Sequence, residues 1–357
     1  MMFARSSSDS RNVLVVRLES DIATARLVKV DKGVASLIEA KLGPKDMRTV
    51  RGSEDSNRIN EVIASFTNQA MSELNVRPDI VSVSCPGTID IHCQTIIRSS
   101  RLGILQPLNC GELLNETRGI GVYLFNDAIC IARIELRNMS GGKIPDSAVF
   151  IMVGQGVGSA IYLGGELYAG AGAGGHIGRI VVNPDGPISQ RFNQRGTLES
   201  YTSHESIVQR LIGEHQNEME KTSDEQLRRK PYFRFRQILQ AAKRPLDVRI
   251  PEIATALDQG DPLVTEAVDD AARYLGQCIS YIITLLNPNL IVVGGELIDG
   301  LSTYFDRAAS SAKRYSSRLA WETTKLVKAS QGVDAQFLGA AELASIFLDS
   351  KQGIPIT

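Results

Sequence analysis

Residues 149–187 read VFIMVGQGVGSAIYLGGELYAGAGAGGHIGRIVVNPDGP, and this stretch decides the fold. The apolar run Val149–Val153 predicts a buried strand that enters the glycine-rich turn Gly154–Gly158. Ile161–Leu163 and Glu166–Tyr168, separated by a pair of glycines, predict a hairpin. A strand that runs into glycine-rich backbone is typical of α/β proteins, whose ligands bind beyond the carboxyl ends of the strands.

The same pattern of a short apolar run ending at a turn recurs along the chain. The runs and their turns are Asp79–Ser84 with Gly87, Gly121–Phe125 with Asn126-Asp127, and Leu290–Val293 with Gly294-Gly295. Val13–Val16 and Thr24–Val30 predict an opening hairpin. Helical spacing is found in Asn57–Leu74, Ala128–Leu136, Tyr274–Leu286 and Ala335–Ala344. Alternating strands and helices predict an α/β architecture, and no long-period repeat is visible.

Composition narrows the class of protein. A chain of 357 residues is long enough for two lobes with separate cores. Apolar residues make up 43% and charged residues 22%, as in soluble globular proteins. The net charge of -1 gives no bulk attraction to nucleic acid or to an anionic membrane. The five cysteines are scattered without a C-x-x-C pair, which favours a reducing cytoplasm over a disulfide framework.

The chain begins with a polar segment. Residues 1–12 contain no apolar stretch like that of a secretory signal, so we expect a flexible tail there. No apolar run approaches the ~18 residues of a membrane span. We therefore expect a cytoplasmic protein without a membrane partner.

The turns, in this order, resemble those of the ROK family (repressors, open reading frames and kinases), a family of two-lobed, actin-like sugar kinases and their relatives. The resemblance runs from about Val13 to Ala344. It is carried by SCPGTID at Ser84–Asp90, FNDA at Phe125–Ala128, VGQGVG at Val153–Gly158, GGHIGRIVVNPDGP at Gly174–Pro187, GTLE at Gly196–Glu199 and NPNLIVVGGE at Asn287–Glu296. A single glycine-rich turn is weak evidence, whereas the ordered set is specific.

The resemblance implies a role for each matching residue. Asn126 and Asp127 would bind a sugar hydroxyl, with Asp127 as the candidate catalytic base if the protein is a kinase. Gly87, Thr88 and Glu199 match positions that contact the sugar. The nucleotide, if it is still bound, would contact Gly154, Gln155, Gly156, Gly158, Gly294 and Gly295.

The first strand departs from the family pattern. Family kinases follow it with D-x-G-G-T, whose Asp helps to hold the metal and whose glycines cradle phosphate. The matching residues here are Arg17, Leu18, Glu19, Ser20 and Asp21. The side chains of Glu19 and Ser20 would fill space that the nucleotide needs, and the acids would repel phosphate. A shifted alignment makes Asp21 the acid, but no glycine pair follows it.

Two further motifs are replaced. The family's E-x-G-H is His176-Ile177-Gly178-Arg179 here, so hydrogen-bond donors replace an acceptor at the sugar. The family's structural zinc loop has three cysteines and that histidine. Gln190, Phe192, Thr197 and Arg179 occupy the four ligand positions. These residues cannot complete a four-coordinate zinc site, so we expect no zinc.

Some roles stay open at this point. Arg179 either pairs with Glu199 or faces an anionic ligand. The basic, aromatic segment Leu227–Arg249 is a solvated helix face, a lobe or dimer contact, or a DNA-binding surface; its Tyr232, Phe233 and Phe235 favour a hydrophobic anchor. No helix-turn-helix module precedes the first strand, so we do not expect direct DNA binding.

The sequence as a whole predicts a two-lobed, actin-like α/β protein that binds a ligand with Gly87, Thr88, Asn126, Asp127, His176, Arg179 and Glu199. We expect residues 13–127 and 335–357 to form one lobe and 128–334 the other, with a helical insertion at about 203–262. The favoured function is non-catalytic sensing of a sugar, sugar phosphate or acidic sugar by a homodimer or homotetramer. The alternative is a sugar kinase, and only this alternative requires ATP and magnesium.

Overall fold

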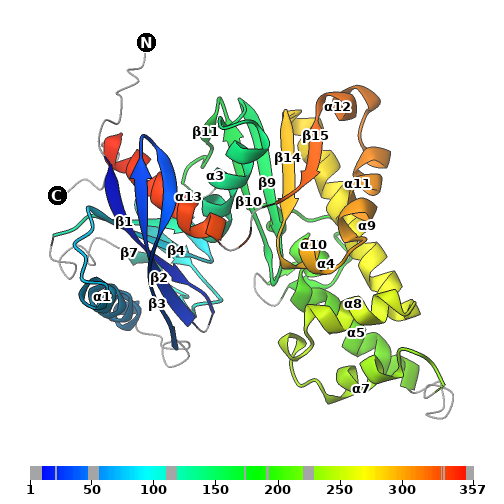
Figure 1. Ribbon diagram of the computed structural model, residues 1–357. Coiled ribbons are helices and arrows are strands. Elements are labelled where there is room, and N and C mark those ends of the chain that lie inside the picture. Colours follow the sequence, from blue (N-terminus) through cyan, green and yellow to red (C-terminus); the bar gives the residue numbers. More distant parts are fainter. Residues whose placement is uncertain are drawn as a thin grey trace. The chain divides into compact units, whose positions relative to one another are not determined.

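The apolar runs of the sequence become the central strands of two separate β-sheets (Figure 1). The structure is a computed structural model that describes residues 10–20, 22–46, 56–109, 119–172, 174–189, 193–219, 229–330, 332 and 334–350. The chain divides into two units. The first unit falls within Met1–Ile144, Leu167–Gly175 and Gln331–Thr357. The second unit falls within Pro145–Glu166 and His176–Ser330.

The first unit contains a five-stranded sheet in the order β3-β2-β1-β4-β8. Its strands are β1 Arg11–Leu18, β2 Ile22–Asp31, β3 Val34–Asp46, β4 Ile80–Cys85 and β8 Val122–Asn126. The predicted opening hairpin is confirmed as the antiparallel pair of β1 and β2. β1 begins two residues before Val13, inside the predicted tail. The strand β3 was not predicted, because its alternation is interrupted by glycine, proline and charged residues.

Helices and a small sheet complete the first unit. They are α1 Ser56–Glu73, α3 Asp127–Met139, α13 Asp334–Asp349, and the strands β5 Thr88–Asp90, β6 Thr95–Arg98 and β7 Leu108–Asn109. α13 packs against α3 and against β1 to β4. Its buried Phe337 and Leu343 join Val15 and Val83 of the sheet in one core. The predicted helices Asn57–Leu74 and Ala335–Ala344 are confirmed as α1 and α13.

An ion cluster ties α3 to α13. The Glu342 side chain is fully buried, and its Oε2 accepts a hydrogen bond of 3.0 Å from Arg133 Nε. Its Oε1 accepts bonds from Arg137 Nη1 and from the Ala35 N–H. α3 thus belongs to the first unit, which extends to Ile144 rather than ending at Asp127 as the sequence suggested.

The second unit repeats the sheet topology of the first. Its sheet has the order β11-β10-β9-β14-β15, formed by β9 Ser147–Val153, β10 Val157–Leu163, β11 Glu166–Leu167, β14 Leu290–Gly294 and β15 Lys325–Lys328. In both sheets the first strand pairs antiparallel with the second and parallel with the fourth. The repeat was not visible in the sequence, because the corresponding turns after β1 and β9 share no residues.

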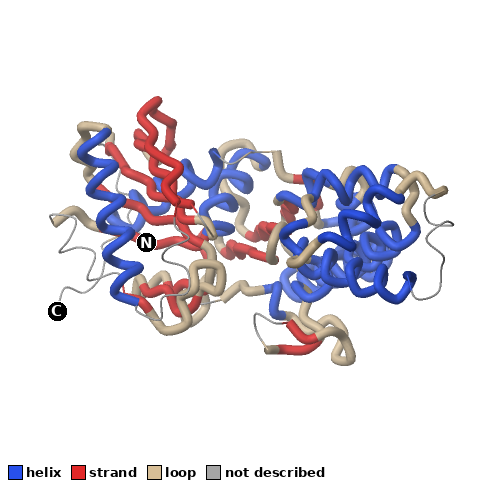
Figure 2. Tube along the Cα trace, turned by 90° about the horizontal axis from the view of Figure 1, so that it is seen from below, coloured by secondary structure: helices blue, strands red, loops and turns tan. Residues whose placement is uncertain are grey.

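Helices dominate the rest of the second unit, and Figure 2 shows them gathered beside its strands. They are η1 Ile177–Arg179, α4 Glu199–Thr202, α5 His204–Met219, α7 Phe233–Ala241, η2 Pro245–Asp247, α8 Ile250–Asp258, α9 Pro262–Leu286, α10 Glu296–Gly300, α11 Tyr304–Tyr315 and α12 Arg318–Thr323. A small ribbon, β12 Ile188–Ser189 with β13 Gln194–Arg195, precedes α4. The long α9 contributes more buried residues to the core of this unit than any other element, and the predicted helix Tyr274–Leu286 forms its second half.

Part of the basic segment is built into this helical core, whereas residues 229–231 are exposed. Tyr232 and Phe235 are buried. Arg236 is 1% exposed, and its Nη2 lies 2.9 Å from Asp261 Oδ1. Arg244 pairs with the acid three residues later, Asp247. These contacts favour the hydrophobic-anchor interpretation over a free cationic face; residues 227 and 228 lie outside the described part.

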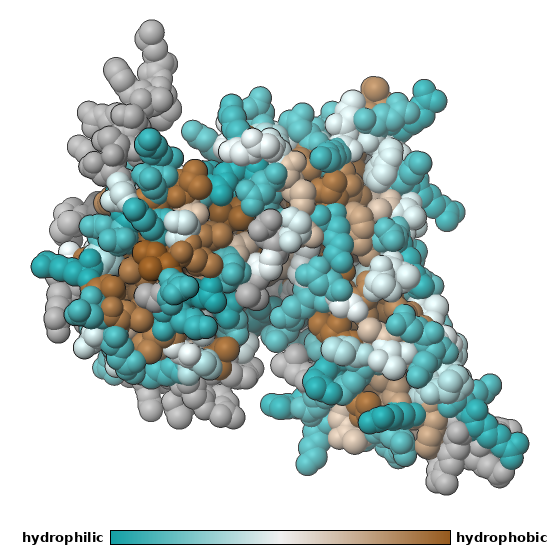
Figure 3. Space-filling model, viewed as in Figure 1, coloured by the Kyte–Doolittle hydropathy of each residue, from teal (hydrophilic) through white to brown (hydrophobic). Residues whose placement is uncertain are grey.

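Among the described residues no helix is long and apolar enough to cross a membrane. Figure 3 shows hydrophobic residues in patches among hydrophilic ones on the face in view. Leu285 of α9 and Leu319 of α12 are 80% and 76% exposed. Large apolar side chains at this exposure are candidates for contact with a partner.

Candidate ligand-binding and active site

Asn126 links two turns of the first unit. It is the N-cap of α3, where its side chain accepts a bond of 2.9 Å from the Ala128 N–H. Its Nδ2 donates a bond of 2.8 Å to the Gly87 carbonyl. Because β4 and β8 are neighbouring parallel strands, their ends bring the two turns together. The structure therefore places Gly87 next to Asn126 and Asp127.

Gly87 has a φ of 132°, and a Cβ there would lie 2.6 Å from the Arg98 carbonyl oxygen. Only glycine fits this turn without displacing backbone. Thr88 follows as the buried first residue of β5 and pairs with Arg98 of β6. The turn thereby fixes where the small sheet β5–β6 starts beside the candidate site.

Asp127 begins α3 with a carboxylate that is only partly exposed. Its Oδ1 accepts a bond of 2.9 Å from the Ala128 N–H, and its Oδ2 lies 3.9 Å from Arg101 Nη1. Burial raises the pKa of Asp127, and Arg101 partly counteracts this rise. A raised pKa makes a carboxylate a stronger proton acceptor. The group can therefore hold a ligand hydroxyl, and its chemistry also suits a general base.

Side chains fill the end of β1. Arg17 Nη2 lies 2.9 Å from Glu19 Oε1, and the Arg17 guanidinium lies 5.1 Å from the centre of the Phe337 ring. The Glu19 N–H donates to the Ile22 carbonyl and closes the turn. Asp21 lies outside the described residues. Backbone N–H groups approach a phosphate closely where glycine leaves room for it, and the described turn has Glu19 and Ser20 in place of the glycines.

The matching turn of the second unit keeps its glycines. The Gly154 N–H donates a bond of 3.0 Å to the Gly156 carbonyl, and the Gly154 carbonyl accepts from the His204 N–H. Gln155, at the tip, is half-buried, and Gly158 pairs with Met152 in the sheet. A Cβ at Gly154 would meet nothing closer than 3.9 Å. Packing alone thus does not require glycine at 154.

Gly294 and Gly295 are required by packing. Gly295 has a φ of 107°, and a Cβ there would lie 2.5 Å from the Val153 carbonyl oxygen. A Cβ at Gly294 would lie 2.5 Å from that of Ala329. These two glycines let the end of β14 approach β9 and β15 closely. Their presence is explained without a nucleotide.

The short helix η1 and Glu199 approach the start of β10 from two segments. Gly178, in η1, packs so closely on β10 that a Cβ would lie 2.7 Å from the Val157 carbonyl oxygen. The buried Glu199 accepts a bond of 2.8 Å from the Val157 N–H. Val157 therefore brings η1 and the start of α4 together within the second unit.

The imidazole of His176 is expected to be neutral. Burial lowers its pKa, and the nearby Arg179 guanidinium lowers it further. Since an unperturbed histidine titrates near pH 6.5, a lowered pKa leaves the neutral form at pH 7. Arg179 is exposed. Of the two residues that replace the family's E-x-G-H, Arg179 alone brings positive charge.

The positions that match the family's zinc loop do not form a metal site in the described part. Thr197 is buried, and its hydroxyl lies 2.6 Å from the Ser200 hydroxyl. Gln190 and Phe192 lie outside the described residues, and Arg179 is a cation. No group of three or more His, Cys, Asp or Glu side chains among the described residues could hold a metal. An uncharged hydroxyl and a guanidinium do not fit zinc.

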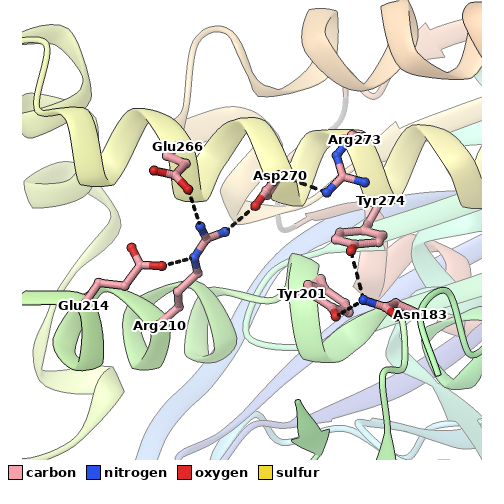
Figure 4. Close-up of polar contacts among 8 residues, drawn as sticks. All are labelled: Asn183, Tyr201, Arg210, Glu214, Glu266, Asp270, Arg273 and Tyr274. Atoms are coloured by element: carbon pink, nitrogen blue, oxygen red, sulfur yellow. Dashed lines mark hydrogen bonds and ion pairs between the residues drawn. The ribbon is translucent and has the colours of Figure 1, made fainter. Parts of the chain in front are cut away.

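An aromatic cluster lies in the same part of the second unit. The rings of Tyr201 and Tyr274 stack with their centres 3.9 Å apart. Asn183 Nδ2 donates to both hydroxyls, at 2.9 Å and 3.3 Å (Figure 4). Arg273 lies 4.3 Å from the Tyr274 ring centre. Tyr201 follows Glu199 by two residues, so the cluster also fixes the short helix that carries Glu199.

Sequence reasoning missed Arg101 and the aromatic cluster. Arg101 reaches Asp127 from a turn after β6, and Tyr274 reaches Tyr201 from α9. Both contacts join segments far apart in the sequence, and no spacing rule connects them. The predicted site residues divide between the units: Gly87, Thr88, Asn126 and Asp127 lie in the first, and His176, Arg179 and Glu199 in the second.

Comparison with known proteins identifies the same family as the ordered motifs do. A model of the ROK family matches residues 48–346. The N-acetylglucosamine repressor NagC of Escherichia coli is 26% identical over 226 residues, which cover 61% of this chain and 48% of NagC. This chain thus spans about half the length of that regulator.

Kinases and regulators both resemble the chain. The glucokinase of Streptomyces coelicolor is 28% identical over 291 residues, covering 80% of this chain and 86% of the kinase. A crystal structure of a ROK family transcriptional regulator, a homologue of the Escherichia coli MLC protein, has a TM-score of 0.72 at 21% identity. That alignment covers 96% of this chain and 79% of the regulator. The shared architecture is the two-lobed, actin-like sugar-kinase fold.

Proposed function

Since the chain belongs to the ROK family, we propose that it is a non-catalytic member that senses a sugar, sugar phosphate or acidic sugar. The observation that carries this proposal is the filled end of β1. There, Arg17 pairs with Glu19 and stacks on Phe337, where a kinase needs a metal-holding acid and open glycines. Phosphoryl transfer depends on positioning and neutralising the phosphates, so a blocked phosphate turn removes the main catalytic contribution.

The sugar-binding half of the machinery is retained. Asn126 holds the Gly87 turn, and Asp127 presents a partly buried carboxylate beside Arg101. Glu199 is fixed by the Val157 N–H. These groups supply the acceptors and donors that bind sugar hydroxyls. Arg179 adds a positive charge, which supports an anionic ligand.

We propose that ligand binding by this protein has a regulatory role. NagC is a DNA-binding regulator, but the present chain spans only about half its length. We therefore propose a ligand-binding role for the part of the chain that matches this regulator. Exposed Leu285 and Leu319 support a homodimer or homotetramer. A ligand changes such a protein only by binding one of its conformations more tightly than another.

A sugar panel tests the ligand class. Thermal shift should show stabilisation by glucose 6-phosphate or glucuronate that exceeds the effect of glucose. Arg179→Gln should remove that preference. Stabilisation by glucose alone, unaffected by Arg179→Gln, contradicts an anionic ligand.

A sugar kinase is the second candidate, favoured by one observation. The pKa of Asp127 is raised by burial, as suits a general base, and the residue follows Asn126 as in family kinases. The similarity to a glucokinase over 86% of its length also supports this candidate. Steady ATP consumption with hexoses or amino sugars, abolished by Asp127→Asn with unchanged folding, would establish it.

A further inference from the structure

A cavity lies within the second unit, and neither Asp127 nor His176 lines it. Its volume is about 470 Å³, within the ~300–1,000 Å³ of small-molecule pockets. The ribbon strand β12, the short helix α4 and the helices α5 and α9 enclose it. Glu199 is the one predicted ligand residue that also lines this cavity.

The ring of Tyr201 forms one wall of the cavity, and contacts with two other residues fix its position. Stacking on Tyr274 and the bond from Asn183 fix its orientation (Figure 4). Burial raises the pKa of Tyr201 to about 12, so its hydroxyl keeps its proton at neutral pH. Pro187 and Ile188 extend this wall with apolar surface. A rigid, partly aromatic wall suits the C–H face of a small ring compound.

Arg210 and Asp270 form another part of the wall, and they belong to an ion network whose side chains are equally fixed. Arg210 donates to Glu214 at 2.6 Å, to Asp270 at 2.8 Å and to Glu266 at 3.2 Å, using all three of its nitrogen atoms. Asp270 also accepts from Arg273 at 2.9 Å. Figure 4 shows these side chains converging from α5 and α9. Bonds of this kind, made among side chains of the wall and those behind it, hold the wall in one geometry before any ligand arrives.

The network carries an excess of negative charge. Two guanidinium groups, Arg210 and Arg273, face the three carboxylates of Glu214, Glu266 and Asp270. Burial alone would raise the pKa of Asp270, but bonds from Arg273 and Arg210 hold it below the ordinary value. The cavity is also lined by Glu205 and Glu199. An anion is disfavoured here, whereas an ammonium group is attracted.

We propose that this cavity is a second ligand site, which takes a small hydroxyl-bearing primary amine in its protonated form. The carboxylate wall receives the ammonium and hydroxyl groups, and the Tyr201 wall covers the apolar face. Glu199 lines the cavity and is also a predicted ligand residue, and Tyr201 lies on the same short helix, so occupancy of the cavity changes the position of Glu199 and with it the affinity for the first ligand. Such coupling is reciprocal.

The test uses three pyranoses of matched size and different charge: glucosamine, glucose and glucuronate. Calorimetry with the full chain, at a pH where the amine is protonated, should show glucosamine binding more tightly than glucose in the Asp127→Asn variant. Gln209 is exposed at the mouth of the cavity. Gln209→Trp should weaken glucosamine binding by roughly tenfold, through obstruction. Gln209→Glu, of nearly the same shape, should tighten it by up to about fivefold.

The results separate this site from the first one. Asp127→Asn should leave glucosamine binding within about twofold, since Asp127 is not part of the cavity wall. Absence of saturable glucosamine binding contradicts the second site, as does binding that neither Gln209 variant changes. Glucuronate binding that is lost in Gln209→Trp but kept in Asp127→Asn contradicts the assigned charge. A failure of the first-site proposal alone leaves the glucosamine result intact.

Discussion

Substitution of the buried Glu342 tests most directly what stabilises the first unit. The substitution Glu342→Gln keeps the size of the side chain and one carbonyl oxygen for the Ala35 N–H, but it removes the charge. Arg133 and Arg137, whose side chains are 20% and 14% exposed, then lack their shared anion. Loss of one partner of a buried ion pair costs about 3–5 kcal/mol.

The retained shape and the partial exposure of both arginines place the expected loss near the lower end, at about 3 kcal/mol. For a unit of this size, each kcal/mol shifts the melting temperature by about 2–4 °C, so a decrease of about 6–12 °C is expected. Because α3 begins with Asp127, the variant should also bind the sugar ligand more weakly. Differential scanning calorimetry and ligand titration measure the two effects.

The matched control is Asp349→Asn, which breaks the exposed pair between Asp349 and Arg11. That pair has a 2.5 Å contact, but the acid is 41% exposed, so the loss should stay below ~1 kcal/mol. If Glu342→Gln changes the free energy of unfolding no more than Asp349→Asn does, the ion cluster does not hold α3 in place.

Three further predictions follow from the glycines, the histidines and the zinc-loop positions. Gly295→Ala should destabilise the protein by about 2 kcal/mol or more in urea denaturation, because φ is 107° and the added Cβ would meet backbone atoms. The control Gly213→Ala lies inside α5, where a Cβ would have no atom within 4 Å, and it should stabilise the protein by about 0.5–1 kcal/mol. Equal effects of the two substitutions would refute the packing role of Gly295. Burial lowers the pKa values of His176, His204 and His215, so the unfolded chain takes up protons first; stability should therefore decrease as the pH falls below about 6.5, and His176→Asn should make that decrease shallower. A pH-independent stability between pH 5 and 7 would contradict the buried neutral imidazoles. Dialysis against EDTA should leave the melting temperature unchanged, and a decrease of several degrees would indicate a structural metal.

Much of the fold follows from local patterns. Val13–Val16, Asp79–Ser84 and Gly121–Phe125 are apolar runs of strand length, and the glycine or Asn-Asp turns mark where they end. The helix at Asn57–Leu74 has clear helical spacing, and the structure has it at Ser56–Glu73. Such elements are set by residues close in sequence, so the sequence predicts them well.

Contacts between distant segments could not be predicted in this way. Asp127 was recognised from its motif, but its cation Arg101 comes from a turn with no pattern of its own. The stacked Tyr201 and Tyr274 come from a four-residue helix and from α9. Tertiary packing determines which residue each of these side chains contacts, and no local sequence pattern reveals that packing.

The central claim is that the filled end of β1 prevents nucleotide binding. Isothermal titration calorimetry with ATP–magnesium, in the presence and absence of a saturating sugar ligand, tests it most directly. The account predicts no saturable heat at millimolar nucleotide, because Arg17 and Glu19 occupy the phosphate turn. Saturable ATP–magnesium binding with a Kd well below millimolar, retained while Arg17 and Glu19 are both in place, would contradict it.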